Sequence, residues 1–88
     1  MPYFVYILRT SANTLYIGQT NDLEKRLKDH KEKNKKSAKY MRSFSSFTLV
    51  YTEPYATRSE AMKREWELKQ LTKTQKEALI AKYNLTKT

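Results

Sequence analysis

Five side chains of types that can act on a phosphodiester occur along the sequence: Tyr6, Tyr16, Arg26, His30 and Glu65. Hydrolysis of that bond needs a base that deprotonates water, a cation that stabilises the charge developing on phosphorus, and a proton or metal ion for the leaving oxygen. A tyrosine or His30 can supply the first, Arg26 the second, and Mg²⁺ held by Glu65 the third. Core packing, an ion pair and a helix surface remain ordinary alternatives for the same side chains.

Two short apolar runs must position the tyrosines. Tyr3–Leu8 is β-branched or aromatic and apolar on both alternating faces, which is typical of a central strand. Residues 9–14 are polar and turn-forming, and Leu15–Ile17 then resumes a strand, so we expect a β-hairpin. Such a hairpin places Tyr6 opposite or diagonal to Tyr16, within reach of one another.

Gly18 is the only glycine among the 88 residues. It stands where the second apolar run meets the start of a helix. A single glycine at such a join indicates a backbone constraint, which is either a positive φ or close approach by another group.

The helix that follows is predicted over Asp22–Glu32, because Asn21–Glu24 has the N-cap and the N3 acid of a capping box. At 100° per residue, Arg26 and His30 border the apolar stripe that begins at Leu23, and the lysines lie on the opposite side. An arginine at that border is unusual and needs a partner or a function.

Residues 31–42 contain six Lys or Arg side chains among twelve residues. This stretch is either a solvated loop or a strip that contacts nucleic-acid phosphates, with an aromatic ring available for stacking. The candidate nucleic-acid-binding residues are Lys33, Lys35, Lys36, Lys39, Tyr40, Arg42 and, further along the chain, Lys69.

The second half of the chain predicts one strand and two helices. Phe47–Tyr51 is a strand that ends at residues 52–54, where a proline occurs. A capping box at residues 57–60 begins a helix that runs to about residue 71. A second box at residues 74–77 begins the last helix, which we expect to end at Asn84.

Glu65 falls inside the apolar arc of the first of these helices. A carboxylate that faces a core is costly unless it is paired or bound to a metal ion. A salt bridge to a basic neighbour is the ordinary explanation. Lys69, one turn later, either contacts phosphate or neutralises Glu65.

Composition bounds the class of protein. A chain of this length makes one domain, expected over residues 1–88 with a core at about 3–80 and a short polar C-terminal tail. The chain has no cysteine and one histidine, which excludes disulfides and thiolate or histidine-rich metal sites. No apolar run reaches the ~20 residues that span a membrane. The net charge of +9 favours a nucleic-acid partner, and we expect a cytoplasmic protein.

Four blocks of residues together resemble the GIY-YIG nuclease domain, over nearly the whole chain from about Tyr3 to Leu79. The likeness is greatest to the short stand-alone bacterial members. The first motif, Phe4-Val5-Tyr6-Ile7, departs from the family pattern because it has no glycine, and it keeps the tyrosine. The blocks are Val5-Tyr6-Ile7, Tyr16-Ile17-Gly18, Thr20-x-x-Leu23-x-x-Arg26-x-x-x-His30, and Glu65-x-x-Leu68-Lys69.

The resemblance implies an α+β fold, a small three-stranded antiparallel sheet flanked by helices. It also implies roles for the strand residues. Tyr6 matches the tyrosine of the first motif, a general-base candidate or water-positioning group. Tyr16 matches that of the second, which orients water or phosphate. Gly18 lets the backbone pack tightly beside the site.

For the helices, the resemblance implies that Arg26 stabilises phosphate and that Glu65 is the single metal-binding glutamate. His30 matches a position often occupied by a proton-transfer residue. Whether Tyr6 or His30 is the base stays open. A single catalytic site would thus explain why both Arg26 and Glu65 lie on the inward-facing sides of their helices.

The function implied is metal-dependent hydrolysis of DNA, with Mg²⁺ or Mn²⁺ as the cofactor. Such an enzyme would recognise DNA by its structure or with weak sequence specificity, and it would act in DNA repair or recombination. RNA is an alternative substrate. Two other hypotheses are a nucleic-acid-binding module with little catalysis and a subunit that acts only with a protein partner. We expect a monomer that does not bind membranes.

Overall fold

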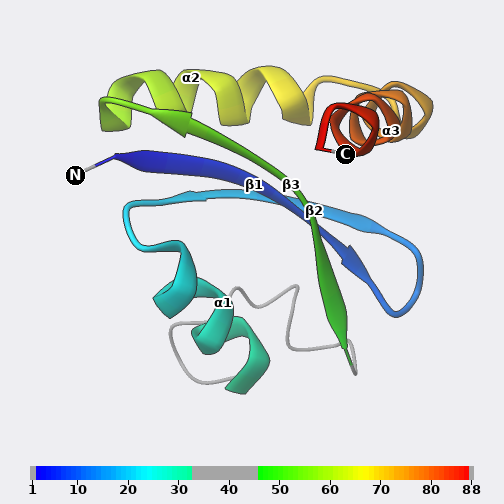
Figure 1. Ribbon diagram of the computed structural model, residues 1–88, viewed down its shortest axis with the longest axis horizontal. Helices are drawn as coiled ribbons and strands as arrows, with labels where there is room; N and C mark the ends of the chain where they lie inside the picture. Colours follow the sequence, from blue (N-terminus) through cyan, green and yellow to red (C-terminus); the bar gives the residue numbers. More distant parts are fainter. Residues whose placement is uncertain (1, 33–45, 88) are drawn as a thin grey trace.

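A computed structural model of the chain describes residues 2–32 and 46–87. Its strands form one antiparallel sheet in the order β2-β1-β3, so the predicted α+β fold is confirmed (Figure 1). Among the described residues, no helix has the length and hydropathy needed to cross a bilayer. The elements in chain order are β1 (Tyr3–Thr10), β2 (Leu15–Thr20), α1 (Leu23–Glu32), β3 (Phe47–Tyr55), α2 (Arg58–Lys69) and α3 (Lys73–Lys87).

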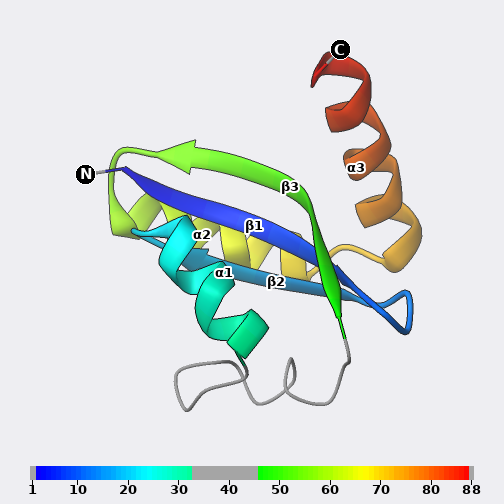
Figure 2. The ribbon, with the colours of Figure 1, turned by 60° about the horizontal axis from the view of Figure 1, so that its bottom comes forward.

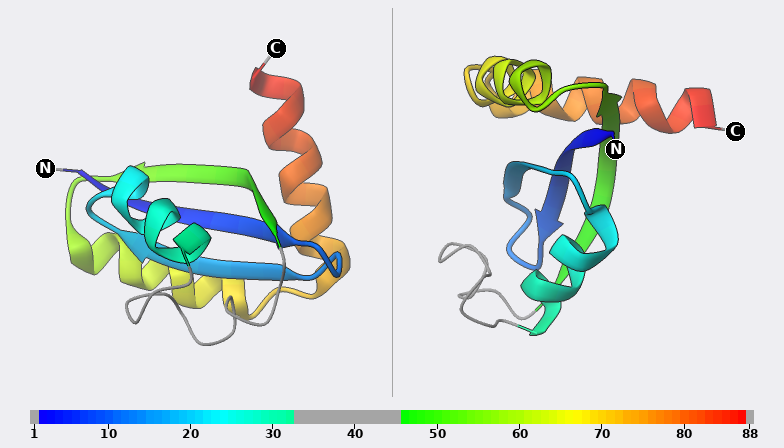
Figure 3. Two further views of the ribbon diagram at one scale, coloured as in Figure 1. Left: turned by 90° about the horizontal axis from the view of Figure 1, so that it is seen from below. Right: turned by 90° about the vertical axis from the view of Figure 1, so that its left-hand side faces the viewer.

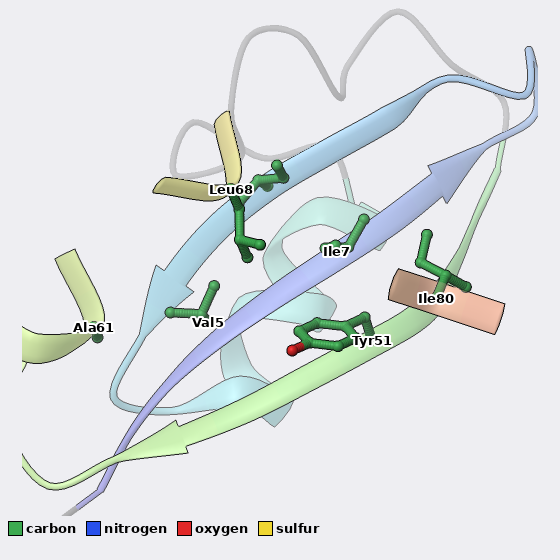
Figure 4. Packing of buried hydrophobic residues seen from close by; sticks show 7 residues of the cluster. Val5, Ile7, Tyr51, Ala61, Leu68 and Ile80 are labelled. Atoms are coloured by element: carbon green, nitrogen blue, oxygen red, sulfur yellow. The ribbon is translucent and has the colours of Figure 1, made fainter. Parts of the chain in front are cut away.

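The central strand β1 is buried on both faces, as its continuous apolar pattern predicts. Val5 and Ile7 face α2 and α3, where they join a core that includes Leu68 and Tyr51 (Figure 4). Tyr6 and Leu8 face the other way, toward α1. Helices therefore cover both faces of the sheet, with α1 on one side and α2 on the other (Figure 3).

The hairpin of β1 and β2 has the expected geometry. Tyr6 pairs with Gly18, and Leu8 pairs with Tyr16, so the two tyrosines are diagonal neighbours on one face. Their ring centroids are 6.4 Å apart. The prediction that the two rings lie within reach of one another is confirmed.

The prediction that the third strand ends at Tyr51 is wrong. β3 continues to Tyr55 and pairs with β1 on both sides of a bulge at Val50, Pro54 lying opposite Phe4. Proline has no N–H to donate, but β3 is at the edge of the sheet and needs hydrogen bonds on one side only. Proline therefore ends a strand less reliably at an edge than at the centre.

Two helix starts lie elsewhere than predicted. The N-cap of α1 is Asp22 and not Asn21, because the Asp22 carboxylate accepts from the Lys25 N–H at 3.1 Å. The capping box of α3 is formed by Thr72 and Gln75, before the predicted residues 74–77. Short polar runs contain several residues able to cap, and the sequence alone does not choose among them.

The helix ends also differ in part. α2 begins after Thr57, as predicted, and ends at Lys69, two residues earlier than expected. α3 continues past Asn84 to Lys87, so the predicted end of this helix is wrong. Neither glycine nor proline follows Asn84, and nothing else in the backbone stops the helix there. In Figure 2, α3 projects from the sheet with its C-terminus far from α1.

One ion pair and one hydrogen bond attach α3 to the hairpin. The Arg9 guanidinium donates to both carboxylate oxygens of Glu77, at 2.7 and 2.5 Å. The Lys73 ammonium donates to the backbone oxygen of Asn13 at 2.7 Å. These contacts hold the start of α3 at the same end of the sheet as the first residues of β2.

Candidate active site

The site begins with the contact between Gly18 and Tyr6, which pair across β1 and β2. A Cβ atom at Gly18 would lie 2.5 Å from the Tyr6 hydroxyl oxygen and 2.7 Å from its Cζ atom. The φ angle of Gly18 is not positive. Of the two constraints that the sequence indicated, the structure therefore shows close approach, by the ring of Tyr6.

We expect Gly18→Ala to lower the free energy of unfolding by about 1–3 kcal/mol, as overpacking does in rigid interiors. Tyr6 is 0% exposed and cannot swing aside to admit the new methyl group. Urea unfolding of Gly18→Ala would measure the loss. In a Tyr6→Phe background the loss should be smaller, because the closest atom is gone. An equal loss in both backgrounds would contradict this explanation.

His30 is the buried partner of Tyr6. The Tyr6 hydroxyl lies 3.1 Å from His30 Nε2, and the His30 side chain is 1% exposed. Burial, together with the smaller effect of the nearby charge of Arg26, lowers the pKa of His30 to about 4. The imidazole is therefore neutral at pH 7, and with its own proton on Nδ1 its Nε2 accepts a hydrogen bond from the Tyr6 hydroxyl.

Arg26 is half-buried beside the two tyrosines and donates hydrogen bonds to the hydroxyls of Tyr6 and Tyr16. Burial raises the pKa of Tyr6 to about 12, although the bond from Arg26 acts in the opposite direction. The Tyr16 ring lies edge-on to His30, with centroids 5.5 Å apart. Four of the predicted side chains are thus in mutual contact between α1 and the hairpin.

Phe47 of β3 belongs to the same cluster. Its ring stands edge-on to His30 at 6.2 Å between centroids. The sequence did not single it out, because an aromatic residue at the start of a strand is ordinary in a core. Only the antiparallel pairing of β3 with β1 brings it under α1.

Glu65 approaches from the other side of the sheet. Along α2, Arg64 faces β3, since its Nε lies 3.0 Å from Oε1 of Glu53. Glu65 and Lys69 are on the opposite flank, toward β2, where Lys69 shares a hollow with Tyr16. Because β2 is an edge strand, groups from both faces can meet at its open edge.

The Glu65 side chain is 22% exposed and its Oε2 atom lies 3.2 Å from the Lys69 ammonium. Of the two interpretations of Lys69, neutralisation of Glu65 is therefore the one that this structure shows. The Glu65 charge also reaches Tyr6: burial is the main cause of the raised pKa of Tyr6, and Glu65 adds to it.

The hollow beside Tyr16 has a volume of about 330 Å³. Leu15, Tyr16 and Ile17 of β2 form one wall, and Lys69 and Lys76 line the other. Lys76 was missed in the sequence, because it lies on another helix and only the turn between α2 and α3 returns it to this edge. The two lysine side chains make this hollow suitable for an anion such as a phosphate group.

The donor set for a metal ion is small. Among the described residues, no three His, Cys, Asp or Glu side chains gather in a group that could hold a metal ion. The Glu65 carboxylate alone fits a largely hydrated Mg²⁺, which needs only one or two protein carboxylates. For that to occur, Lys69 must turn away from Glu65.

Most of the lysine-rich strip that the sequence singled out lies outside the described residues. Lys69 is the one candidate nucleic-acid-binding residue that the structure places. The remaining candidates, which stay predictions, are Lys33, Lys35, Lys36, Lys39, Tyr40 and Arg42.

A family model described as the GIY-YIG catalytic domain matches residues 2–84. The chain therefore belongs to the GIY-YIG family, which supports a nuclease-type function. Among curated proteins it is 45% identical to UPF0213 protein YhbQ of Escherichia coli K12 over 80 residues, 91% of this chain and 78% of that protein. That name states no activity.

Two solved structures are also similar. UPF0213 protein BH0048 from Bacillus halodurans is 38% identical, with a TM-score of 0.59 over 92% of this chain and 84% of that one. Protein EF2693 from E. faecalis is 33% identical, with a TM-score of 0.65 over 97% of this chain and 88% of that one. Both are solution NMR structures, and both support the fold described above.

Proposed function

We propose that this chain is a metal-dependent nuclease that hydrolyses phosphodiester bonds of DNA. The observation that supports it most is the position of Arg26, whose guanidinium bonds to two tyrosine hydroxyls. A hydrogen-bonded cation on the edge of a tyrosine cluster can stabilise the charge of a pentavalent phosphate. Family membership supports the same reaction class.

We assign the contact with the attacking water to Tyr16. Its side chain is half-buried and lines the hollow, whereas Tyr6 is 0% exposed. Burial raises the pKa of Tyr6 to about 12, so its ionised form is rarer at neutral pH than that of an ordinary tyrosine. Tyr6 and His30 therefore serve in this proposal to orient Arg26 and Tyr16, and neither contacts the water.

Glu65 would hold the metal ion, Mg²⁺ or Mn²⁺. When bound, such an ion polarises the phosphate and stabilises the leaving oxygen. Lys69, released from Glu65, and Lys76 are then free to pair with phosphates in the hollow. Both lysines line that hollow already.

The proposed substrate is DNA that is recognised by its backbone charge or by a structure such as a branch, in repair or recombination. The side chains assigned here to the substrate, Arg26, Lys69 and Lys76, would contact phosphates, and backbone contacts carry no sequence information. RNA is the alternative substrate. The setting that we propose is a cytoplasmic monomer.

One observation favours a second candidate, a nucleic-acid-binding module with little catalysis. The ion pair between Lys69 and Glu65 occupies the carboxylate that the metal needs. In such a module, the pair would persist and DNA would bind without being cut. If the chain acts only with a protein partner, the isolated chain should instead bind DNA poorly.

The test of this proposal is removal of the metal. Wild-type protein is incubated with supercoiled and branched DNA in Mg²⁺, in Mn²⁺ or in excess EDTA. We expect cutting with either ion and none with EDTA, restored when Mg²⁺ is added back, because hydrolysis needs the ion's charge. DNA that is bound and left intact in both ions would favour the binding module.

A further inference from the structure

The outer flank of α2 exposes two large apolar side chains. Trp66 is 64% exposed and Met62 is 47% exposed. They stand four residues apart, so they are neighbours on the same side of the helix. Single exposed apolar residues are common on protein surfaces, but an adjacent pair that includes a tryptophan is often a contact site.

Two cations bracket this pair. Arg58 and Lys69 are exposed at the two ends of α2, at spacings that keep them on the flank with Met62 and Trp66. We call Arg58, Met62, Trp66 and Lys69 the α2 stripe. The stripe is about 16 Å long at 1.5 Å per residue, which is enough to follow a few nucleotides of one strand.

Each end of the α2 stripe opens on a hollow beside β2. Lys69 borders the hollow of about 330 Å³ that contains Tyr16. Arg58 borders a second hollow of about 290 Å³, which is lined by Tyr3 and by residues 19–21. In Figure 3, α2 follows β2 along the open edge of the sheet.

The chemistry of the α2 stripe fits a nucleic acid better than a second protein surface. An apolar partner would cover Trp66 but would also bury the Arg58 charge and the Lys69–Glu65 ion pair, which is costly. A single strand supplies both components, because its phosphates pair with the cations and its bases stack on an aromatic ring. A duplex conceals the faces of its bases and offers no such stacking.

We propose that the α2 stripe binds unpaired nucleotides of the substrate, with one base stacked on Trp66. The proposal rests on the proposed nuclease function and names its substrate class: nucleic acid with a single-stranded segment beside the cut. Glu65 lies one residue before Trp66, so a strand on the stripe brings a phosphate toward Glu65 and Tyr16. Trp66 is a positioning residue for that strand.

Fluorescence offers a direct test, because Trp66 is the only tryptophan in the chain. Wild-type protein in EDTA, where cutting is suppressed, is titrated with a short oligothymidine and separately with a duplex of equal length. We expect the single strand to quench Trp66 strongly and the duplex to quench it little. Strong, equal quenching by both would overturn the preference for unpaired nucleotides.

Substitutions make the test specific. Trp66→Ala should weaken single-strand binding by about 5- to 100-fold and leave duplex affinity nearly unchanged, whereas Trp66→Phe should retain most of the affinity. Leu85→Ala is the matched control, since Leu85 is 78% exposed on α3, away from the stripe. The fluorescence anisotropy of a labelled single strand measures its affinity for wild type and for the three variants. Circular dichroism checks that all four proteins are folded.

The outcomes separate this proposal from the nuclease itself. Single-strand affinity that is unchanged in Trp66→Ala would overturn the stacking surface, even if DNA is cut in Mg²⁺. Trp66-dependent binding in a protein that never cuts DNA would uphold the surface and reject the nuclease. Trp66 emission that shifts with protein concentration alone would mean that a second copy covers the stripe, and would also overturn the proposal.

Discussion

Replacing Glu65 by alanine is expected to abolish metal-dependent cutting, with a fall in rate of at least about 1,000-fold. Glu65 is the carboxylate that we assign to the metal ion, and the described residues near it form no acidic cluster that could replace it. Cleavage of supercoiled DNA in Mg²⁺ measures the loss. DNA binding in EDTA should be nearly intact and should not weaken, because the substitution removes a charge that repels phosphates and releases Lys69.

The matched control is Glu67→Ala. Glu67 is on the same helix, 45% exposed, and its described ion pair is a long one of 3.6 Å to Arg64. Its loss should leave both cutting and binding within about twofold of wild type. Equal traces of cutting in the Glu65→Ala and wild-type preparations would assign the activity to a contaminant and favour the binding module.

Arg26→Ala is expected to lower the cutting rate by about 100- to 1,000-fold, as loss of one preorganised charge donor does in other sites. Arg26 bonds to the hydroxyls of Tyr6 and Tyr16, so its removal also frees Tyr16 from its position. Single-turnover cleavage at saturating protein separates this rate from DNA affinity. We expect the affinity to fall by far less than the rate.

Arg26→Lys distinguishes geometry from charge. An ammonium has three donors on one nitrogen at the end of a flexible chain. It cannot reproduce the rigid planar fork with which a guanidinium bonds to two tyrosine hydroxyls and a phosphate. We therefore expect little recovery with lysine. Lys28→Ala is the control, since Lys28 is an exposed cation of the same helix that points away from the sheet. Full activity in Arg26→Lys would show that charge alone is needed there.

Several features of the fold follow from the sequence because local patterns determine them. The continuous apolar run of β1, the polar turn and the short run of β2 specify a hairpin, and the diagonal contact of Tyr6 with Tyr16 follows from it. The apolar stripe of α1 correctly placed Arg26 and His30 at its inward side. Each of these inferences needs only residues close in sequence.

Other features depend on contacts between distant segments. Pro54 is compatible with a strand only because β3 is an edge, and the sequence does not show which strands are edges. Glu65 and Tyr16 come from opposite faces of the sheet, so no periodicity relates them. The four-residue spacing of Glu65 and Lys69, in contrast, is enough to predict their ion pair. The sequence could not choose between that pair and a contact of Lys69 with phosphate.

The position of Pro54 in β3 has a consequence for how this protein behaves at high concentration. A sheet edge with a full row of N–H and C=O groups can pair with the same edge of another molecule, which begins a growing β-aggregate. Pro54 removes one donor near the end of β3. The same residue that extends the strand past its predicted end therefore makes this edge a poor template for a fourth strand.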